Sequence, residues 1–243
     1  MVPAPNAVNS ATGGTDPAIS ADGRLLAYTA PCLGGSVFLR NVDSGAGNGW
    51  TVHLPAGVPT AHVPGVPGAQ VTHLAWAPDG VHLAVSVRGA NWQGVEILDT
   101  SQPPSATKTR LVGPPPPTSP GESVAGWADA TWTSPRHGSQ LGGQLVVLAP
   151  RCAPYMDCVT GGWRALAVDP GTGRSTLLAG EGAGGTTPTA LAADPAGGSF
   201  VAVAGSKVVR LAGGRPPAVV VGGAAAVGWV TGPLAGTPGG SGH

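Results

Sequence analysis

Charge is the scarcest property of this sequence. Asp, Glu, Lys and Arg make up 10% of its residues, and twelve cations balance twelve anions to a formal net charge of zero. Only two of the cations are lysines, Lys108 and Lys207. A protein without a basic stripe cannot neutralise a row of phosphates, which supplies much of the affinity of nucleic-acid-binding proteins. We therefore expect no nucleic-acid partner.

Long apolar runs are missing as well. No stretch approaches the roughly 20 apolar residues that span a bilayer as a helix, so we expect no membrane span in this chain. Residues 1–6 contain neither the basic nor the apolar segment of a secretory signal. We expect an extracytoplasmic or cell-envelope domain whose signal or anchor lies outside this sequence, which the three cysteines favour. A cytoplasmic protein is the alternative. The abundance of Ala, Gly and Pro with little Lys suggests a GC-rich bacterial genome, such as that of an actinobacterium.

Cysteine occurs three times. Cys152 and Cys158 are six residues apart in an expected hairpin loop, and a disulfide that closes this loop would stabilise it. The alternative is a pair of reduced thiols. We expect Cys32 to be unpaired. Structural zinc needs four ligands at close spacing, which this sequence does not offer, so we expect neither a metal nor a cofactor.

Helical periodicity is also absent. The apolar runs are four to seven residues long, rich in Val and Leu, and bounded by Gly, Pro, Asp and Ser, which is typical of strands. Gly (41 residues) and Pro (26 residues) together exceed a quarter of the chain, a proportion that indicates disorder when no repeat is present. Here they cluster between the apolar runs and mark turns, so the sequence predicts an all-β protein.

A repeated phrase organises these strands. An apolar strand, a turn built on Asp-Gly or its equivalent, and a second apolar strand recur along the chain. The anchors of the four copies are separated by 57, 56 and 60 residues, and a fifth match, Val230, follows 37 residues later; the four are Ser20, Ala77, Thr133 and Ala193. Strands that recur at such a period indicate the blades of a β-propeller joined by loops of variable length.

Each copy continues with a third and a fourth strand. The third strands are expected at 36–42, 94–98, 163–168 and 207–211, and the fourth at 50–54, 107–112, 174–178 and 218–221. A second turn follows three of the third strands, at Asp43, Asp99 and Asp169. Four antiparallel strands joined by short polar turns make one blade.

The expected fold is therefore an all-β propeller of four-stranded antiparallel blades, with four full repeats and a partial fifth. The propeller covers 16–231, with blades at about 16–57, 70–113, 123–180 and 187–223 and a partial blade at 224–231. We expect 1–15 to be mobile and 232–243 to be a flexible tail. The alternative, a fragment of a larger propeller, stays open.

The second copy carries the most specific pattern. Its residues Trp76-Ala-Pro-Asp79-Gly80-Val-His-Leu-Ala-Val85, followed later by Asp99-Thr-Ser, resemble the TolB-like, WD-type β-propeller repeat. The first copy has Asp-Gly but no Trp, the third keeps the Trp but has His-Gly, and the fourth permutes the turn. This resemblance covers about 16–231. It implies a protein-binding module, often the sensor or scaffold part of a bacterial envelope protein.

Six residues of the repeat are interpreted as structural. Tryptophans immediately before the anchor are expected to pack between blades, and aspartates at the first turn are expected to cap it through their own backbone. The tryptophans are Trp76, Trp132 and Trp229, and the aspartates are Asp22, Asp79 and Asp194.

Catalytic groups are too few to indicate an enzyme. The innermost strands carry one acid, Asp129, and one histidine, His73, which is less than a carboxylate pair or a metal cage requires. His73 and His82 flank the second Asp-Gly turn, so a shared metal or a pH-sensitive pair is one interpretation. Two half-exposed strand histidines are the favoured one.

Loop aromatics are the candidate binding residues. Trp92, Trp127 and Tyr155 are expected on loops near the mouth of the propeller, where aromatic side chains commonly contact partners. The alternative is that they fold back over a blade edge. We expect a non-enzymatic binding or scaffold module with another protein at the mouth. The alternatives are a small-molecule or saccharide-binding propeller, the accessory propeller of a hydrolase, and a purely structural fragment.

Overall fold

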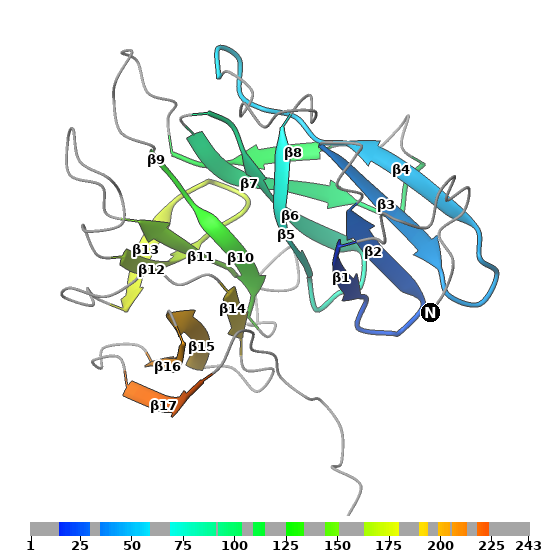
Figure 1. Ribbon diagram of the computed structural model, residues 1–243. Helices are drawn as coiled ribbons and strands as arrows, with labels where there is room; N and C mark the ends of the chain where they lie inside the picture. Colours follow the sequence, from blue (N-terminus) through cyan, green and yellow to red (C-terminus); the bar gives the residue numbers. More distant parts are fainter. Residues whose placement is uncertain are drawn as a thin grey trace, which may run out of the picture.

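Every described element of the structure is a β-strand. The computed structural model describes residues 15–29, 35–58, 69–90, 92–103, 109–114, 125–133, 144–150, 163–179, 190–193, 199–204, 206–212 and 218–223. Their strands form four antiparallel sheets in which consecutive strands are neighbours (Figure 1). Four-stranded antiparallel sheets repeated along the chain are consistent with propeller blades.

The four sheets follow the order of the chain. Blade 1 contains β1 (Thr15–Ile19), β2 (Leu25–Thr29), β3 (Ser36–Asn41) and β4 (Gly47–Thr51). Blade 2 contains β5 (Gln70–Trp76), β6 (His82–Arg88), β7 (Trp92–Asp99) and β8 (Thr109–Val112). Blade 3 contains β10 (Ala128–Trp132), β11 (Leu145–Pro150), β12 (Trp163–Val168) and β13 (Ser175–Ala179). Blade 4 contains β14 (Ala190–Ala193), β15 (Ser199–Ala204), β16 (Lys207–Ala212) and β17 (Ala218–Gly222).

Two strands differ from expectation. The fourth strand of blade 1 lies at 47–51 rather than 50–54, because a tight turn returns the chain directly so that Gly47 pairs with Arg40. The short β9 (Ala125–Gly126) was not predicted. It pairs in parallel with the start of β7 and so connects blade 3 to blade 2.

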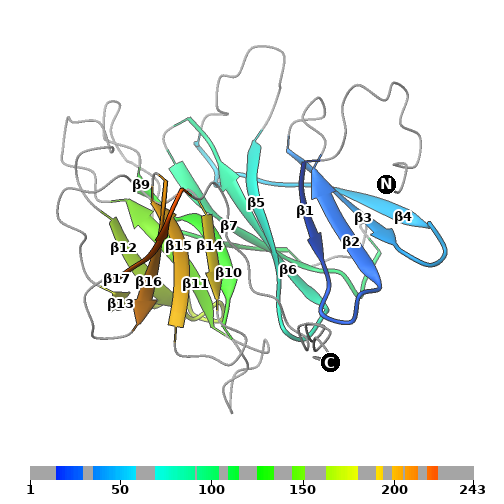
Figure 2. The same ribbon diagram turned by 60° about the horizontal axis from the view of Figure 1, so that its bottom comes forward.

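The blades are arranged side by side around a common centre. The first strand of each blade (β1, β5, β10 and β14) lies innermost, and the fourth strand lies on the rim (Figures 1 and 2). No described strand lies between blade 4 and blade 1, so the described blades form an open arc. The partial fifth blade expected at 224–231, with Trp229, lies outside the described residues.

The anchors mark equivalent positions in three blades. The backbone N–H of Ser20 donates to the Leu25 carbonyl at 2.9 Å, that of Ala77 to His82 at 2.8 Å, and that of Thr133 to Gln144 at 2.9 Å. Each bond closes the turn between the first and second strands. In blades 1 and 2 the turn also needs a left-handed residue, which is Gly23 (φ 75°) or Gly80 (φ 69°).

Tryptophans next to the anchor connect adjacent blades. Trp76 Nε1 donates to the Ala18 carbonyl at 3.1 Å, and Trp132 Nε1 donates to the Ala75 carbonyl at 3.1 Å. Ala18 and Ala75 each lie two residues before their own anchor, so the same bond is formed at successive blades. Each indole fills the space between two inner strands and pairs a carbonyl on the edge of the sheet. Ile19 has the equivalent place in blade 1 and is 62% exposed.

Three apolar cores fill the spaces between the blades. The first lies between blades 1 and 2, the second between blades 2 and 3, and the third between blades 3 and 4. Strand β6 contributes to two of them, with Leu83, Val85 and Val87 in the first core and Ala84 in the second. Because both of its faces are buried, β6 is a nearly continuous apolar run rather than an alternating one.

Glu96 is the charged residue that this packing buries completely. It lies on β7, and its carboxylate accepts the backbone N–H of His53 at 2.8 Å and pairs with His53 Nδ1 at 2.9 Å. His53 follows the last strand of blade 1. The pair therefore joins blade 1 to blade 2 and supplies the partners that a buried carboxylate needs.

In each blade, the turns after the first and the third strand lie on the same side of the arc. We call this side the turn end, and polar side chains cap its turns. Asp79 Oδ1 accepts the backbone N–H groups of Val81 and His82, and Asp22 Oδ1 accepts that of Arg24. A hydrogen bond from the Ser20 hydroxyl also lowers the pKa of Asp22. Asp194, expected to cap the first turn of blade 4, lies outside the described residues.

The second turn corrects one assignment. Asp99 Oδ1 and Asp169 Oδ1 accept the backbone N–H two residues later, but in blade 1 this acceptor is Asn41, not Asp43. Asn41 Oδ1 accepts the N–H groups of Asp43 and Ser44 at 3.0 and 2.8 Å. An amide oxygen accepts the same bonds as a carboxylate oxygen, so a pattern based on Asp alone selected the wrong residue.

Replacing Trp132 with alanine should destabilise the fold strongly. The side chain is 5% exposed and lies in the core between blades 2 and 3. We expect Trp132→Ala to lower the free energy of unfolding by roughly 3–5 kcal/mol, measured by urea denaturation. Trp132→Phe keeps most of the ring and loses the Nε1–H donor, so it should cost less, about 1–2 kcal/mol. A loss below about 1 kcal/mol for Trp132→Ala would contradict this packing role.

The Asp169 cap should make stability depend on pH. Hydrogen bonds, first that from the Gly171 N–H, hold the pKa of Asp169 below its ordinary value of 3.8. A carboxyl whose pKa is lower in the folded protein stabilises the fold at any pH above its unfolded-state pKa. This stabilisation is lost as pH falls through the folded-state pKa. At neutral pH we expect the order of stability to be wild type, then Asp169→Asn, then Asp169→Ala. In urea titrations the difference in unfolding free energy between wild type and Asp169→Asn should begin to narrow as pH falls below 3.8 and should vanish once pH is below the lowered folded-state pKa. A difference that does not narrow below pH 3.8 would exclude the carboxylate as its cause.

Candidate binding surface at the bulged ends of the inner strands

Three inner strands carry a β-bulge near their beginning. The register shifts between Thr15 and Ala18 in β1, between Val71 and His73 in β5, and between Ala128 and Ala130 in β10. Bulges bend a strand and redirect its side chains, and they are common beside functional sites. We call this side of the arc, where β1, β5 and β10 begin, the bulged end.

Ser86 connects two of the bulges. It is 1% exposed on β6, and its Oγ accepts the backbone N–H of Ala130 at 3.0 Å. Its carbonyl accepts the Thr72 hydroxyl at 3.5 Å, which is a long and weak bond. Sequence reasoning did not single out Ser86, although a serine inside the apolar run from Leu83 to Val87 was a visible signal.

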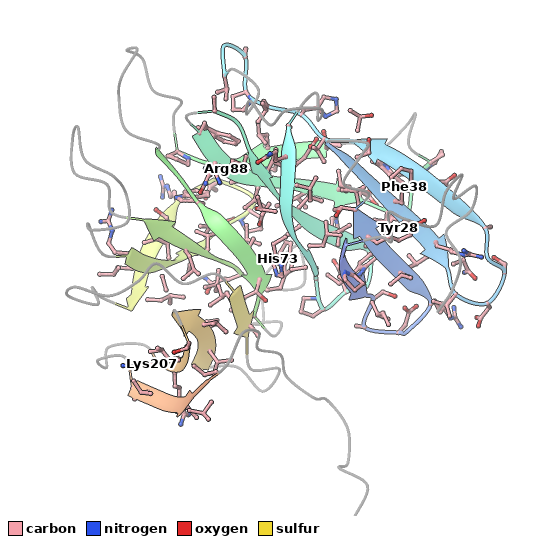
Figure 3. All side chains as sticks on the ribbon, in the orientation of Figure 1. Tyr28, Phe38, His73, Arg88 and Lys207 are labelled. Atoms are coloured by element: carbon pink, nitrogen blue, oxygen red, sulfur yellow. The ribbon has the colours of Figure 1, made fainter. Side chains whose placement is uncertain are left out.

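The bulged end presents polar side chains to solvent. Thr72 and Arg88 are exposed, and His73 is half-buried. Figure 3 shows His73 near the centre of the arrangement and Arg88 toward the end of β6. Arg88 pairs in register with Gln70, two residues before Thr72, so these side chains belong to neighbouring strands. A hydroxyl, an imidazole and a guanidinium can donate hydrogen bonds to a polar or acidic partner surface.

The described residues contain no group of three or more His, Cys, Asp and Glu side chains that could hold a metal ion. Asp129 lies in β10 at its bulge. The interpretation that His73 and His82 share a site is wrong. His73 is in register with Ser86 near the bulged end, whereas His82 lies at the turn end, with Nδ1 2.6 Å from Asp79 Oδ2.

The expectation that Trp92 is an exposed loop residue is wrong. Trp92 begins β7, its side chain is 1% exposed, and its Nε1 donates to the Pro114 carbonyl at 2.9 Å. Two glycines make room for the indole. A Cβ placed on Gly94 would lie 2.1 Å from Trp92 Cη2, and one on Gly113 would lie 2.4 Å from Cζ2. Burying the large apolar ring in this slot is more favourable in free energy than leaving it exposed to solvent for a partner to contact.

Trp127 is likewise buried, with 7% of its surface exposed. Its backbone N–H donates to the Gln93 carbonyl at 3.0 Å and extends the β7–β9 pairing that the sequence did not reveal. It lies at the expected end of the propeller but belongs to the core between blades 2 and 3. Tyr155, Cys32, Cys152 and Cys158 lie outside the described residues, so a role for Tyr155 and the loop disulfide stay predictions.

Comparison with known proteins connects this arrangement to solved structures. No family model matches the sequence, and no curated protein matches it. TolB from Acinetobacter baumannii is similar in structure, with a TM-score of 0.53 and 14% identity over 87% of this chain. The chain has the fold of a TolB-like β-propeller. It spans only 44% of that TolB chain.

Two further propeller structures are similar to it. One is a chain of a nidogen/laminin complex, with a TM-score of 0.55 and 11% identity, over 90% of this chain and 70% of that one. The other is a family 74 xyloglucanase from Xanthomonas campestris, with a TM-score of 0.54 and 16% identity, over 82% of this chain and 28% of that one. At such identities the likeness shows the fold, and one fold carries many functions. The function therefore has to be argued from the site.

The Trp92 slot gives a test by double substitution. Gly113→Ala should destabilise the propeller by roughly 1–3 kcal/mol, because its Cβ would overlap the indole. In a Trp92→Leu background the same change should cost much less, since the atoms nearest to that Cβ all belong to Trp92. Gly94→Ala is the control. Its Cβ would also lie 2.9 Å from the Val112 carbonyl oxygen, so part of its cost should persist in the Trp92→Leu background. Urea denaturation measures the free energies of wild type, the three single variants and the two double variants, and additive costs for Gly113→Ala and Trp92→Leu would contradict the slot.

Proposed function

We propose that this propeller is a non-enzymatic protein-binding module whose bulged end is the binding surface. The observation that carries the proposal is the recurrence of bulges near the start of β1, β5 and β10. Three blades thus depart from regular pairing on the same side of the molecule. The opposite side is formed by compact, capped turns that satisfy their own backbone groups.

The scaffold near this surface is well packed and hydrogen-bonded, which favours binding. Trp92 and Trp127 are buried and hydrogen-bonded just below it, and Ser86 connects two bulges to each other. A preorganised surface loses little conformational entropy when a partner docks. Arg88 at the end of β6 and Arg164 near the start of β12 are exposed on the same side, and they favour a partner with acidic groups at its contact surface.

A protein partner fits better than a small ligand. Small-molecule sites gather several polar groups in a concave pocket, whereas the described inner strands are mostly Ala, Leu, Val and Trp. The nidogen/laminin complex shows that a protein of this fold occurs in a protein assembly. The xyloglucanase shares the fold as well, but glycoside chemistry needs a pair of carboxylates. The acids of the described inner strands, Asp16 and Asp129, belong to blades 1 and 3, which have blade 2 between them.

We further propose an extracytoplasmic or cell-envelope location. The resemblance to TolB-like propellers supports it, since that resemblance implies an envelope protein. Among the described residues there is no helix long and apolar enough to cross a membrane.

Affinity capture with surface variants tests the proposal. The tagged propeller is incubated with a cell-envelope extract of the source organism, and recovered proteins are quantified by mass spectrometry. Thr72→Glu places a carboxylate on the bulged end, which repels a partner with acidic groups, and it should reduce recovery of the partner by about tenfold. Thr176→Glu is the matched control, because Thr176 is an exposed residue of the rim strand β13. Equal recovery with both variants would exclude the bulged end, and a wild type that enriches no protein would contradict the binding function.

A further inference from the structure

The outermost strand of blade 4 is an apolar edge. β17 (Ala218–Gly222) lies last in the sheet order β14-β15-β16-β17 and, among the described strands, pairs only with β16. All five of its residues are exposed, and three are consecutive valines: Val219 (61%), Val220 (60%) and Val221 (52%). Figure 1 shows β17 at the periphery, away from the other blades. Exposed apolar edge strands are sites at which another strand can add.

The other rim strands differ from β17. In β4 the apolar residue Trp50 is buried and the remaining positions are Gly, Asn and Thr. In β8 Val112 is buried, and the Arg110 side chain donates to the Gly171 carbonyl of the next blade. In β13 Leu177 is exposed at 59%, but Ser175 and Thr176 precede it. Exposed apolar side chains on both faces are therefore specific to β17 within the described rim, because Leu178 of β13 packs against the core between blades 3 and 4.

Charge near β17 indicates the kind of strand that fits. Lys207 and Arg210 are exposed on β16, in register with Gly222 and Ala218 respectively. They are the charged residues of the described part of blade 4, which contains no Asp or Glu. A second copy of this chain would bring a second pair of cations to the same edge, which is unfavourable. A strand with acidic side chains would be attracted.

We propose that β17 binds an extended segment of a partner protein, with alternating apolar and acidic residues, which adds to blade 4 as a fifth strand. The backbone N–H and C=O groups on the outer side of β17 would pair with the segment, as in other cases of strand addition. The valines would contact its apolar side chains, and its carboxylates, which all lie on one face, would meet Lys207 or Arg210, since these two cations lie on opposite faces of the sheet. This rim site is separate from the bulged end and does not depend on it.

Peptide binding tests the proposal directly. The probe is a short fluorescent peptide of alternating valine and glutamate, titrated with the whole chain and followed by anisotropy. We expect saturable binding, and binding at least about tenfold weaker for the same peptide with lysine in place of glutamate. Val220→Lys should weaken binding of the acidic peptide by about tenfold, because lysine on an edge strand opposes strand addition. Leu177→Lys is the matched control on blade 3 and should bind as wild type.

Two further measurements separate strand addition from simple charge attraction. A peptide methylated on alternate backbone nitrogens loses its donors but keeps its charge, and it should not bind. The double variant Lys207→Glu/Arg210→Glu leaves the β17 backbone intact and should prefer the lysine peptide. Equal binding of the acidic and basic peptides, or of the methylated peptide, would overturn the proposal. So would a concentration-dependent dimer that Val220→Lys abolishes, since a second copy would then occupy the edge.

The Thr72→Glu variant separates the two sites. It should bind the acidic peptide as wild type does, whatever the outcome of affinity capture. Failure of the peptide to bind wild type would refute the β17 site while leaving the bulged end untouched.

Discussion

Burial of both faces of each sheet against its neighbours is the constraint on which this structure depends. A four-stranded sheet with two apolar faces cannot be stable alone in water, because each face needs a partner. The three cores between successive blades meet this need. The hydrogen bonds from Trp76 to Ala18 and from Trp132 to Ala75 join successive blades in the same way. Where the next sheet is absent from the described residues, the equivalent Ile19 is exposed.

The same constraint decides which residues are buried between blades and which stay exposed for a partner to contact. Aromatic residues near the bulged end are buried in the cores. A ring that packs between blades removes more apolar area from water than a ring that is exposed on the surface. The side chains that stay exposed at the bulged end are polar, and the bulges determine their positions. The outer strands at the rim do not pack against another blade along their outer edge, so their composition can vary. In blade 4 the outer strand β17 is apolar and exposed.

Most of the architecture was predictable from sequence, for a physical reason. The turns have strict conformational requirements, so Asp-Gly and the anchors recur in register, and the apolar runs between them are too short for helices. Pairings that no turn encodes were not predictable. Strand β9 is two residues long and pairs with a strand of another blade. Asn41 was missed since its amide replaces a carboxylate.

The candidate site was predicted less well. Loop position was taken to mean exposure, but Gly94 and Gly113, distant from each other in sequence, together create space for Trp92. Such a slot depends on which backbones approach each other and leaves no local pattern. Thr72 and Arg88 have ordinary sequence contexts, and only the strand pairing at the bulge of β5 places them on neighbouring strands.

The pairing of Glu96 with His53 implies that the blades are not interchangeable. The four sheets share one strand order, but the sheet that carries the fully buried Glu96 must follow one that supplies an N–H and an imidazole where its chain leaves the last strand. Any other succession would leave the acid desolvated and alone. The buried Glu96 thus requires that blade 2 follow blade 1, so the order of the blades along the chain is constrained as well as their fold.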